Sequence, residues 1–181
     1  MQSQKTESKS AVLRLDECEE GTSQFDFVVA AEELELYDMD FSFTEPVRVS
    51  LSINRCIETF MMKGQICCLI SGGCCRCLAP TEQPVEASMR LLLQRKQASE
   101  EELEAVQDQE FEILDPGARE VDLKDFIREE IILELPLQIY CRESCKGLCA
   151  QCGHDLNRGQ CSCDKDSVDP RWATLGDLKF S

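Results

Sequence analysis

The sequence predicts an α+β protein, in which an antiparallel β-rich body, either a sheet or an open barrel, carries one or two helices and a small cysteine-rich C-terminal module. Two observations support this prediction. Apolar and polar residues alternate at 47–53 and again at 85–93, and six of the thirteen cysteines lie within residues 141–163. At 181 residues, the chain is long enough to bury a core without disulfide bonds as staples.

Three strands are predicted in the middle of the chain. VRVSLSI at 47–53 alternates apolar with polar residues, which is the pattern of a strand with one buried face. A second apolar stretch spans 57–70, and a third alternates from Val85 to Leu93, with glycine and proline marking the turn between them. Six earlier apolar residues could add strands before these: Phe25, Phe27, Leu34, Leu36, Phe41 and Phe43.

Two later segments have helical features. SEEELEAV at 99–106 begins with a serine cap followed by acids, so it is either a short helix or a solvated acidic linker. VDLKDFIREEIILELP at 121–136 has apolar residues at helical spacing and ends at a proline, which predicts an amphipathic helix of about three turns. We expect it to cover the sheet or lead into the cysteine module. The predicted divisions are a β-rich body with an acidic N-terminal segment (1–97), an acidic helical segment (98–136) and a cysteine-rich metal-binding module with its tail (137–181).

The net charge of −16 is distributed unevenly along the chain. Residues 1–46 hold twelve acids and three bases, and residues 100–134 hold fourteen acids and three bases, giving −9 and −11. Residues 47–97 hold seven bases and three acids, giving +4, and residues 141–163 carry +1. A partly basic face could contact RNA, while the acidic segments could attract a basic protein. The candidate RNA-contacting bases are Arg48, Arg55, Lys63, Arg76, Arg90, Arg95 and Lys96.

The sequence predicts a cytoplasmic protein with no membrane partner. Residues 1–12 lack the apolar run of a signal peptide, and the longest strongly apolar run, ICCLI at 66–70, is far shorter than the ~20 residues that span a bilayer. The chain has no Gly-rich phosphate loop and no Ser/His/Asp constellation, and we expect its one histidine, His154, to be a surface turn residue. Hydrolytic catalysis therefore has little support in the sequence, and we expect no small-molecule substrate.

The cysteine module predicts a structural zinc site. Cys149 and Cys152 form a Cys-x-x-Cys turn, and Gly153 directly after them permits the left-handed backbone that such a turn often needs. Cys161 and Cys163 supply a second pair after a compact turn. In a reducing compartment such cysteines are expected to be ligands rather than disulfides. Four thiolates around one ion leave no open position, which is the chemistry of structural zinc.

The choice of ligands stays open, because six sulfurs compete for four places. Cys141 or Cys145 could replace either member of the second pair. The segment 74–77, CCRC, could also reach the site if a hairpin folds back against it. Alternatively, its cysteines could be small buried apolar residues, as could Cys67 and Cys68 within a strand.

Other cysteine chemistries are alternatives to zinc. Cys145, Cys149 and Cys152 have the spacing of a radical S-adenosylmethionine cluster, but only 29 residues follow, too few for the barrel of such an enzyme. A thioredoxin-like redox pair would need a βαβ setting and a helix at the motif, which the following turn residues disfavour. A ferredoxin-type iron-sulfur site, or free thiols, would make the chain a redox protein.

Five blocks of the sequence resemble a known family, and the order and spacing of the blocks match. The blocks are CCRCLAPTEQPV at 74–85, DLKDFIREEIILELP at 122–136, CKGLCAQCGHDLN at 145–157, CSC at 161–163 and DPRWATL at 169–175. Over roughly residues 25–178 the chain resembles the YceD-like large ribosomal RNA subunit accumulation proteins. Compared with that family, this chain is richer in cysteine at 67–68 and 74–75 and more acidic between sheet and helix.

The resemblance implies a small non-enzymatic protein that supports synthesis, processing or stability of large-subunit (23S) rRNA. It would act by binding an assembly intermediate, a pre-ribosomal particle or a basic ribosomal protein, since the family is associated in bacteria with a small protein of the large subunit. Family members differ in how many terminal cysteines they keep, so a metal here would be architectural. The acidic start of the chain favours the bacterial cytoplasm over an organelle.

Overall fold

The computed structural model describes residues 6–8, 10–37, 41–96 and 111–163. Its strands are β1 (Thr6–Ser8), β2 (Val12–Arg14), β3 (Gly21–Val29), β4 (Ser42–Phe43), β5 (Val47–Cys56), β6 (Thr59–Gly73), β7 (Pro80–Arg95), β8 (Phe111–Leu114) and β9 (Glu120–Asp122). One open sheet has the order β1-β3-β5-β6-β7-β8, with β4 paired to β6, and β2 pairs with β9 in a second sheet. All pairs are antiparallel except β1 with β3 and β7 with β8. The predicted α+β class is confirmed.

The three predicted central strands are β5, β6 and β7. Strands β5 and β7 extend beyond their predicted ranges, whereas β6 begins two residues after its predicted start and ends three residues after its predicted end. The β6–β7 pairing runs without interruption from Thr59 opposite Gln94 to Gly73 opposite Pro80. Of the six earlier apolar residues, Phe25 and Phe27 lie in β3 and Phe43 lies in β4, while Phe41 stands just before β4. Leu34 and Leu36 were expected to add a strand but are buried in a compact turn, in which their amides donate to the carbonyls of Ala30 and Ala31.

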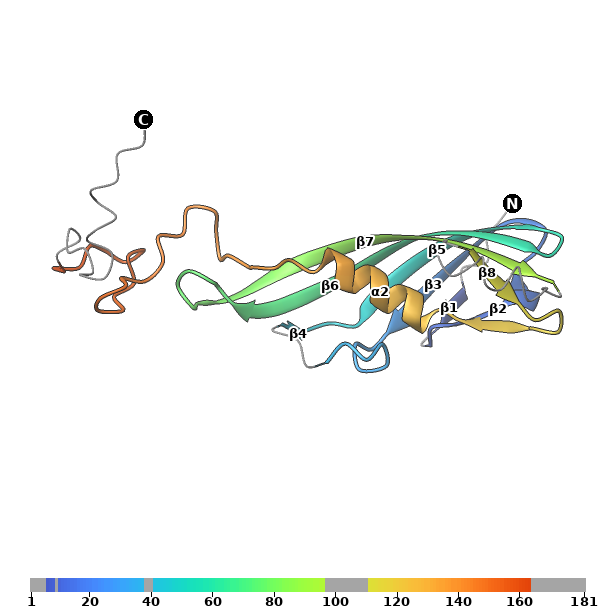
Figure 1. Cartoon of the computed structure of the whole chain (residues 1–181), viewed down its shortest axis with the longest axis horizontal. Helices are drawn as coiled ribbons and strands as arrows, with labels where there is room; N and C mark the ends of the chain where they lie inside the picture. The colour runs from blue at the N-terminus through green and yellow to red at the C-terminus, as the bar shows by residue number, and fades with distance from the viewer. Residues whose placement is uncertain (1–5, 9, 38–40, 97–110, 164–181) are drawn as a thin grey trace, which may run out of the picture.

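The apolar core lies on one face of the main sheet. Helix α2 (Lys124–Glu134) packs there through buried Ile127 and Ile131 (Figure 1), so the predicted amphipathic helix covers the sheet. Alternation along β6 buries Cys68, whose neighbour Cys67 is exposed. The expectation that both residues are buried is therefore wrong for Cys67, since successive side chains of a strand point to opposite faces. The segment 99–106 lies outside the described residues.

Gly64 allows close packing at the centre of the sheet. It is buried in β6, directly between Leu51 of β5 and Met89 of β7. A Cβ at this position would lie 2.4 Å from the Leu51 Cδ2 and 2.8 Å from the Met89 Cγ. The absence of a side chain at Gly64 therefore leaves the room that both neighbours fill.

The β6–β7 hairpin positions the cysteine-rich segment. Figure 1 shows these two strands extending past the rest of the sheet, with the chain after α2 running along them to the region of their tip. A short 3-10 turn, η1 (Leu15–Glu17), adds buried Leu15 to the core. Within the described part of the chain, no helix is long and apolar enough to cross a membrane.

Candidate metal centres

The first cysteine cluster begins in the loop at the tip of the β6–β7 hairpin. The Cys74 amide donates to the Ala79 carbonyl at 2.8 Å, and the Leu78 amide donates to the Cys74 carbonyl at 2.8 Å. Leu78 has a left-handed backbone, with φ of 60°. These bonds close a tight loop, in which two of the three thiols, those of Cys74 and Cys77, can reach a common ligand.

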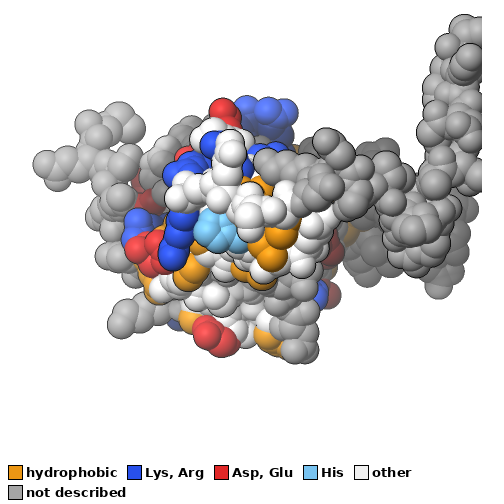
Figure 2. Space-filling view, turned by 90° about the vertical axis from the view of Figure 1, so that its left-hand side faces the viewer, with side chains coloured by type: hydrophobic (Ala, Val, Ile, Leu, Met, Phe, Trp, Pro, Cys, Tyr) orange, Lys and Arg blue, Asp and Glu red, His pale blue; other side chains and the backbone are white. Residues whose placement is uncertain are grey.

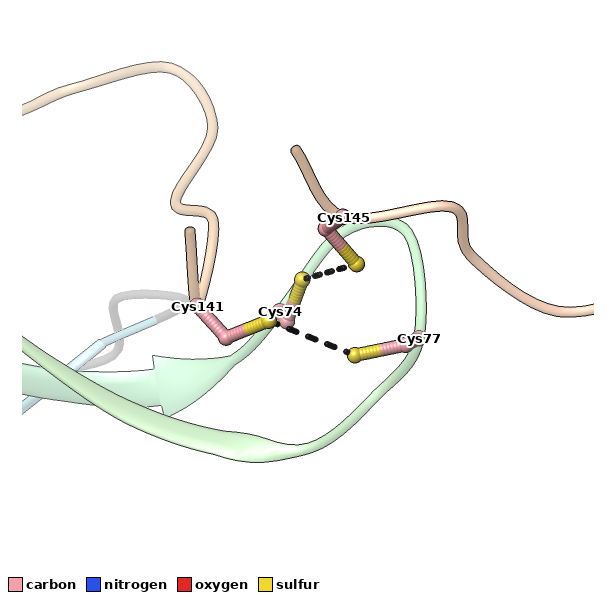
Figure 3. Close-up of side chains that lie close together, drawn as sticks. All are labelled: Cys74, Cys77, Cys141 and Cys145. Atoms are coloured by element: carbon pink, nitrogen blue, oxygen red, sulfur yellow. Dashed lines mark hydrogen bonds between the residues drawn. The ribbon is translucent and has the colours of Figure 1, made fainter. Parts of the chain in front are cut away.

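The segment after α2 brings two further cysteines to this loop. The Cys75 amide donates to the Ile139 carbonyl at 2.9 Å, and the Leu148 amide donates to the Arg76 carbonyl at 3.0 Å. Between these two bonds the chain carries Cys141 and Cys145. We call the resulting group the hairpin cluster, and its members are Cys74, Cys77, Cys141 and Cys145 (Figure 3).

The geometry of the hairpin cluster fits a tetrahedral metal. The Sγ atoms of Cys74 and Cys145 are 3.9 Å apart, and those of Cys77 and Cys141 are 3.7 Å apart. Four thiolates at the usual zinc–sulfur distance of about 2.3 Å would stand about 3.8 Å from one another at the corners of a tetrahedron. All four sulfurs lie within 4.8 Å of one another, so a single ion can touch them all.

The electrostatics of the hairpin cluster also favour a cation. Backbone N–H groups of Cys141, Arg76 and Cys77 stabilise the Cys74 thiolate and lower its pKa to about 6, although burial opposes this. Burial also opposes ionisation of Cys145, but hydrogen bonds from Asn157 and Gly147 help to lower its pKa. Desolvation and the nearby sulfurs raise the pKa of Cys141 to about 12. Adjacent thiolates repel one another, and a bound cation would remove that repulsion.

A second cysteine cluster lies further along the chain. Its members, which we call the terminal cluster, are Cys149, Cys152, Cys161 and Cys163, and their sulfurs also lie within 4.8 Å of one another. The Gly153 amide donates to the Cys149 carbonyl at 2.9 Å, and Gly153 has φ of 72°. Backbone N–H groups of Cys152 and Gln151 lower the pKa of Cys149 to about 6.

The structure divides the cysteines of the module between these two clusters. It gathers the four residues that the sequence predicts as zinc ligands, whereas their alternates, Cys141 and Cys145, join the hairpin loop instead. The segment 74–77 does meet the module, because the chain after α2 runs along the hairpin to its tip, but it joins Cys141 and Cys145 in a separate cluster. Cys74 and Cys77 are spaced as a Cys-x-x-Cys turn directly after Gly72-Gly73, and this signal in the sequence could have indicated a second site.

The seven candidate RNA-contacting bases do not form one surface. Arg48, Lys63 and Arg90 are exposed on the polar face of the sheet, where Lys63 lies directly opposite Arg90. Arg55 and Arg95 instead lie over the Phe60 ring, with their guanidinium carbons 5.4 and 5.9 Å from its centroid. Of the other two, Arg76 lies in the hairpin loop, and Lys96 directly follows Arg95 at the end of β7, where its amide donates to the Leu114 carbonyl.

Arg55 and Arg95 serve the structure of the body. Arg55 donates to the Cys18 carbonyl at 2.8 Å. Arg95 forms an ion pair with Glu58 and donates to the Ala118 carbonyl at 2.9 Å. Since their donors are used within the fold, these two arginines are poorer candidates for RNA contact than the exposed bases.

Exposed bases also gather at the cysteine-rich end of the molecule. Figure 2 shows Lys and Arg side chains beside the single histidine on this face, with acidic side chains among them. The exposed bases of this segment are Arg142, Lys146 and Arg158, and Arg158 pairs with Asp155 at 3.4 Å. None of the three was a sequence candidate, although the positive charge of residues 141–163 indicated such a surface. His154 is exposed in a turn, as predicted.

Comparison with known proteins identifies related chains. The chain is 27% identical to the chloroplastic YCED homolog 1 of Arabidopsis thaliana over 162 residues, and the alignment covers 77% of this chain and 50% of the relative. The Zea mays homolog is 30% identical over 147 residues, covering 68% and 50% of the two chains. Both carry the name large ribosomal RNA subunit accumulation protein, and this chain spans about half the length of each. YlbN of Bacillus subtilis is 27% identical over 175 residues, covering 94% of this chain and 95% of YlbN.

The family match is consistent with these relatives. Residues 62–179 match the family described as "Large ribosomal RNA subunit accumulation protein YceD". The matched region includes most of the β6–β7 hairpin, all of α2 and both cysteine clusters. No solved structure has significant similarity to the chain. From these matches, the chain belongs to the YceD family of large ribosomal RNA subunit accumulation proteins.

Proposed function

We propose that this protein supports the accumulation of large-subunit (23S) rRNA in the cytoplasm, as a non-enzymatic factor that binds an assembly intermediate. The observation that carries the proposal is the family match, because it covers hairpin, helix and cysteine clusters together. In this proposal the β-rich body (1–97) is the scaffold, the segment 98–136 presents acids, and the module 137–181 presents a metal-stabilised surface.

A structural role for the metal supports a binding function. Four thiolates around one ion fill its coordination sphere, so the ion has no open position for a substrate or a reactive water. For the terminal cluster we propose zinc, with Cys149, Cys152, Cys161 and Cys163 as ligands. Colourless protein that loses one zinc ion when Cys149 is replaced would support this assignment. Brown protein containing iron and labile sulfide would contradict it and favour a redox role.

The cysteine-rich end is the surface that we propose to contact RNA. Its exposed bases, Arg142, Lys146 and Arg158, stand out in a chain whose net charge is −16. Cations that contact phosphates release counterions from the RNA, so such binding weakens as salt rises. The polar face of the sheet, with Lys63 and Arg90, is a second candidate surface.

Crosslinking in cells followed by sequencing of the bound RNA tests the RNA proposal. The variant K146E/R158E reverses the charge of two exposed side chains. Among the described hydrogen bonds and ion pairs, neither side chain contacts a cysteine of the two clusters. We expect this variant to lose crosslinks to large-subunit rRNA. Cells that carry the variant instead of the wild-type chain should also contain less of that rRNA. R14E is the control, because Arg14 is also exposed and, like Arg158, pairs with an acid three residues away, but it lies in β2, away from the module. Unchanged crosslinking in K146E/R158E, or equal loss in both variants, would contradict the proposed surface.

The acidic segment is proposed to attract a basic ribosomal protein. Helix α2 presents Asp125, Glu129 and Glu134 to solvent. Neutralising these three acids as D125N/E129Q/E134Q should reduce co-purification of basic ribosomal proteins, and raising the salt should reduce it for the wild-type chain. Association that is indifferent to both changes would refute this part of the proposal.

A further inference from the structure

We propose that the hairpin cluster binds a zinc ion of its own, and that this ion fastens the C-terminal module to the tip of the β6–β7 hairpin. The chain would then hold two structural ions with different tasks. The terminal ion would shape the module locally, whereas the hairpin ion would join two segments that are distant in sequence. This inference does not depend on the proposed role in rRNA accumulation.

The ligands of the hairpin cluster come from opposite sides of the junction. Cys74 and Cys77 belong to the hairpin loop, whereas Cys141 and Cys145 follow α2, and the close sulfur pairs join residues 64 and 71 positions apart. An ion held by all four therefore crosslinks the loop to the module. The same four sulfurs meet the distance test for tetrahedral zinc.

The junction lacks an apolar core that could replace the ion. Cys74 and Cys145 are buried, with 0% and 5% of their surface exposed, yet neither belongs to the hydrophobic core of the sheet. In residues 140–163, the only buried residues are Cys145 and Gly147. A segment that buries so little apolar surface gains little from the hydrophobic effect, and metal binding can supply the missing folding free energy.

Polar contacts align the two sides but are few. One guanidinium nitrogen of Arg76 donates to the carbonyls of Glu143 and Cys145, both at 3.0 Å. The same guanidinium lies 4.5 Å from the centroid of the Tyr140 ring. Such exposed contacts contribute modestly to stability, so they orient the junction while the metal would supply most of the attachment.

Asn157 supports one ligand of the hairpin cluster, although it lies in the loop between Cys152 and Cys161 of the terminal cluster. Its Nδ2 donates to the Cys145 Sγ at 3.5 Å and to Asp155 at 2.8 Å. Its Oδ1 accepts from the Lys146 amide at 2.9 Å and from Arg142 at 2.8 Å. Asn157 lies in the chain between the two thiol pairs of the terminal cluster. It is therefore placed as a positioning residue that connects the two sites, a role typical of the groups around metal ligands.

Metal content of the full chain gives the first test. With zinc as the probe, we expect native mass spectrometry to find two ions in the wild-type chain and one in C74S/C145S. The double variant C149S/C161S, which breaks only the terminal cluster, should also keep one. C75S is the matched control, because Cys75 is exposed and stands between two proposed ligands, and it should keep both ions. A wild-type chain with one ion that C74S/C145S retains would overturn the proposal.

Hydrogen exchange of the same variants tests the fastening role. In C74S/C145S we expect faster exchange at the Cys75 and Leu148 amides, which bond across the junction, with β5 still protected. C149S/C161S should leave those two amides protected. Unchanged protection in C74S/C145S would overturn the fastening role. If that variant does not fold, cobalt titration of the metal-free wild type decides: two tetrathiolate equivalents support the proposal, and one refutes it.

Discussion

Replacing Gly147 by alanine should open the junction between hairpin and module. Gly147 is buried with φ of 75°, a backbone conformation that costs an L-residue about 1–2 kcal/mol. An added Cβ would also lie 2.9 Å from the Arg76 carbonyl oxygen, a backbone atom that already accepts the Leu148 amide. Forcing extra volume into a packed site costs about 1–3 kcal/mol more. The total of about 2–5 kcal/mol corresponds to local opening that is roughly 30-fold more frequent or greater.

Amide hydrogen exchange of Leu148 measures this opening directly. The matched control is G153A, because Gly153 has nearly the same φ, 72°, but nothing within 4 Å of an added Cβ. G153A carries the same cost of a left-handed backbone but makes no close contact through its new Cβ. That cost also falls beside Cys152 of the terminal cluster, not at the contact with Arg76. We therefore expect fast exchange of Leu148 in G147A and near-normal exchange in G153A. Equal exchange in the two variants would refute the argument that close packing of Gly147 on Arg76 holds the junction together.

Three further outcomes are expected. G64A should lower the free energy of unfolding by about 1–3 kcal/mol in urea titration, because the new methyl group overlaps side chains of both neighbouring strands. G73A in the same strand meets only a carbonyl oxygen at 3.8 Å and should have little effect; equal losses would contradict the packing argument. Burial raises the pKa of Cys68 to about 11, so iodoacetamide near pH 8 should modify exposed Cys67 far faster in the folded chain. Similar rates at the two thiols would show that the strand does not hold this alternation. Lys124 of α2 donates a hydrogen bond to the Glu35 carboxylate and lowers its pKa. The ionised carboxylate therefore stabilises the fold at neutral pH, and this stabilisation is lost as the pH falls through the lowered pKa. The melting temperature of E35Q should therefore approach that of wild type in acid, and a constant difference would refute the linkage.

The secondary structure of the body was largely predictable because its signals are local. Alternation at 47–53 and at 85–93 identified β5 and β7, and helical spacing before Pro136 identified α2. Leu34 and Leu36 were misassigned, because buried apolar residues at period two also occur in a compact turn. Strand lengths were underestimated, since pairing between β6 and β7 continues through polar residues that carry no periodic signal.

The candidate bases show a similar limit. Composition identifies seven cations between 47 and 97, and charge alone makes them equivalent. In the fold, Arg55 and Arg95 come from neighbouring parts of the sheet to lie over one phenylalanine ring, and their donors bond to protein carbonyls. Which cations face solvent is decided by cross-strand register, and register depends on pairing across the sheet.

By itself, the sequence determined the α+β class and the family. It favoured Cys149, Cys152, Cys161 and Cys163 as one group, because short turns whose residues favour closure join them, but it left Cys141 and Cys145 as alternates. Only the tertiary structure decided that Cys141 and Cys145 join Cys74 and Cys77. Those pairs are more than sixty residues apart, and they meet because a long hairpin and the end of α2 bring their loops to the same place. Local patterns predict secondary-structure elements and clusters of residues close in sequence. Which two distant loops meet depends instead on the lengths and the packing of the strands and helix that lie between them in the chain.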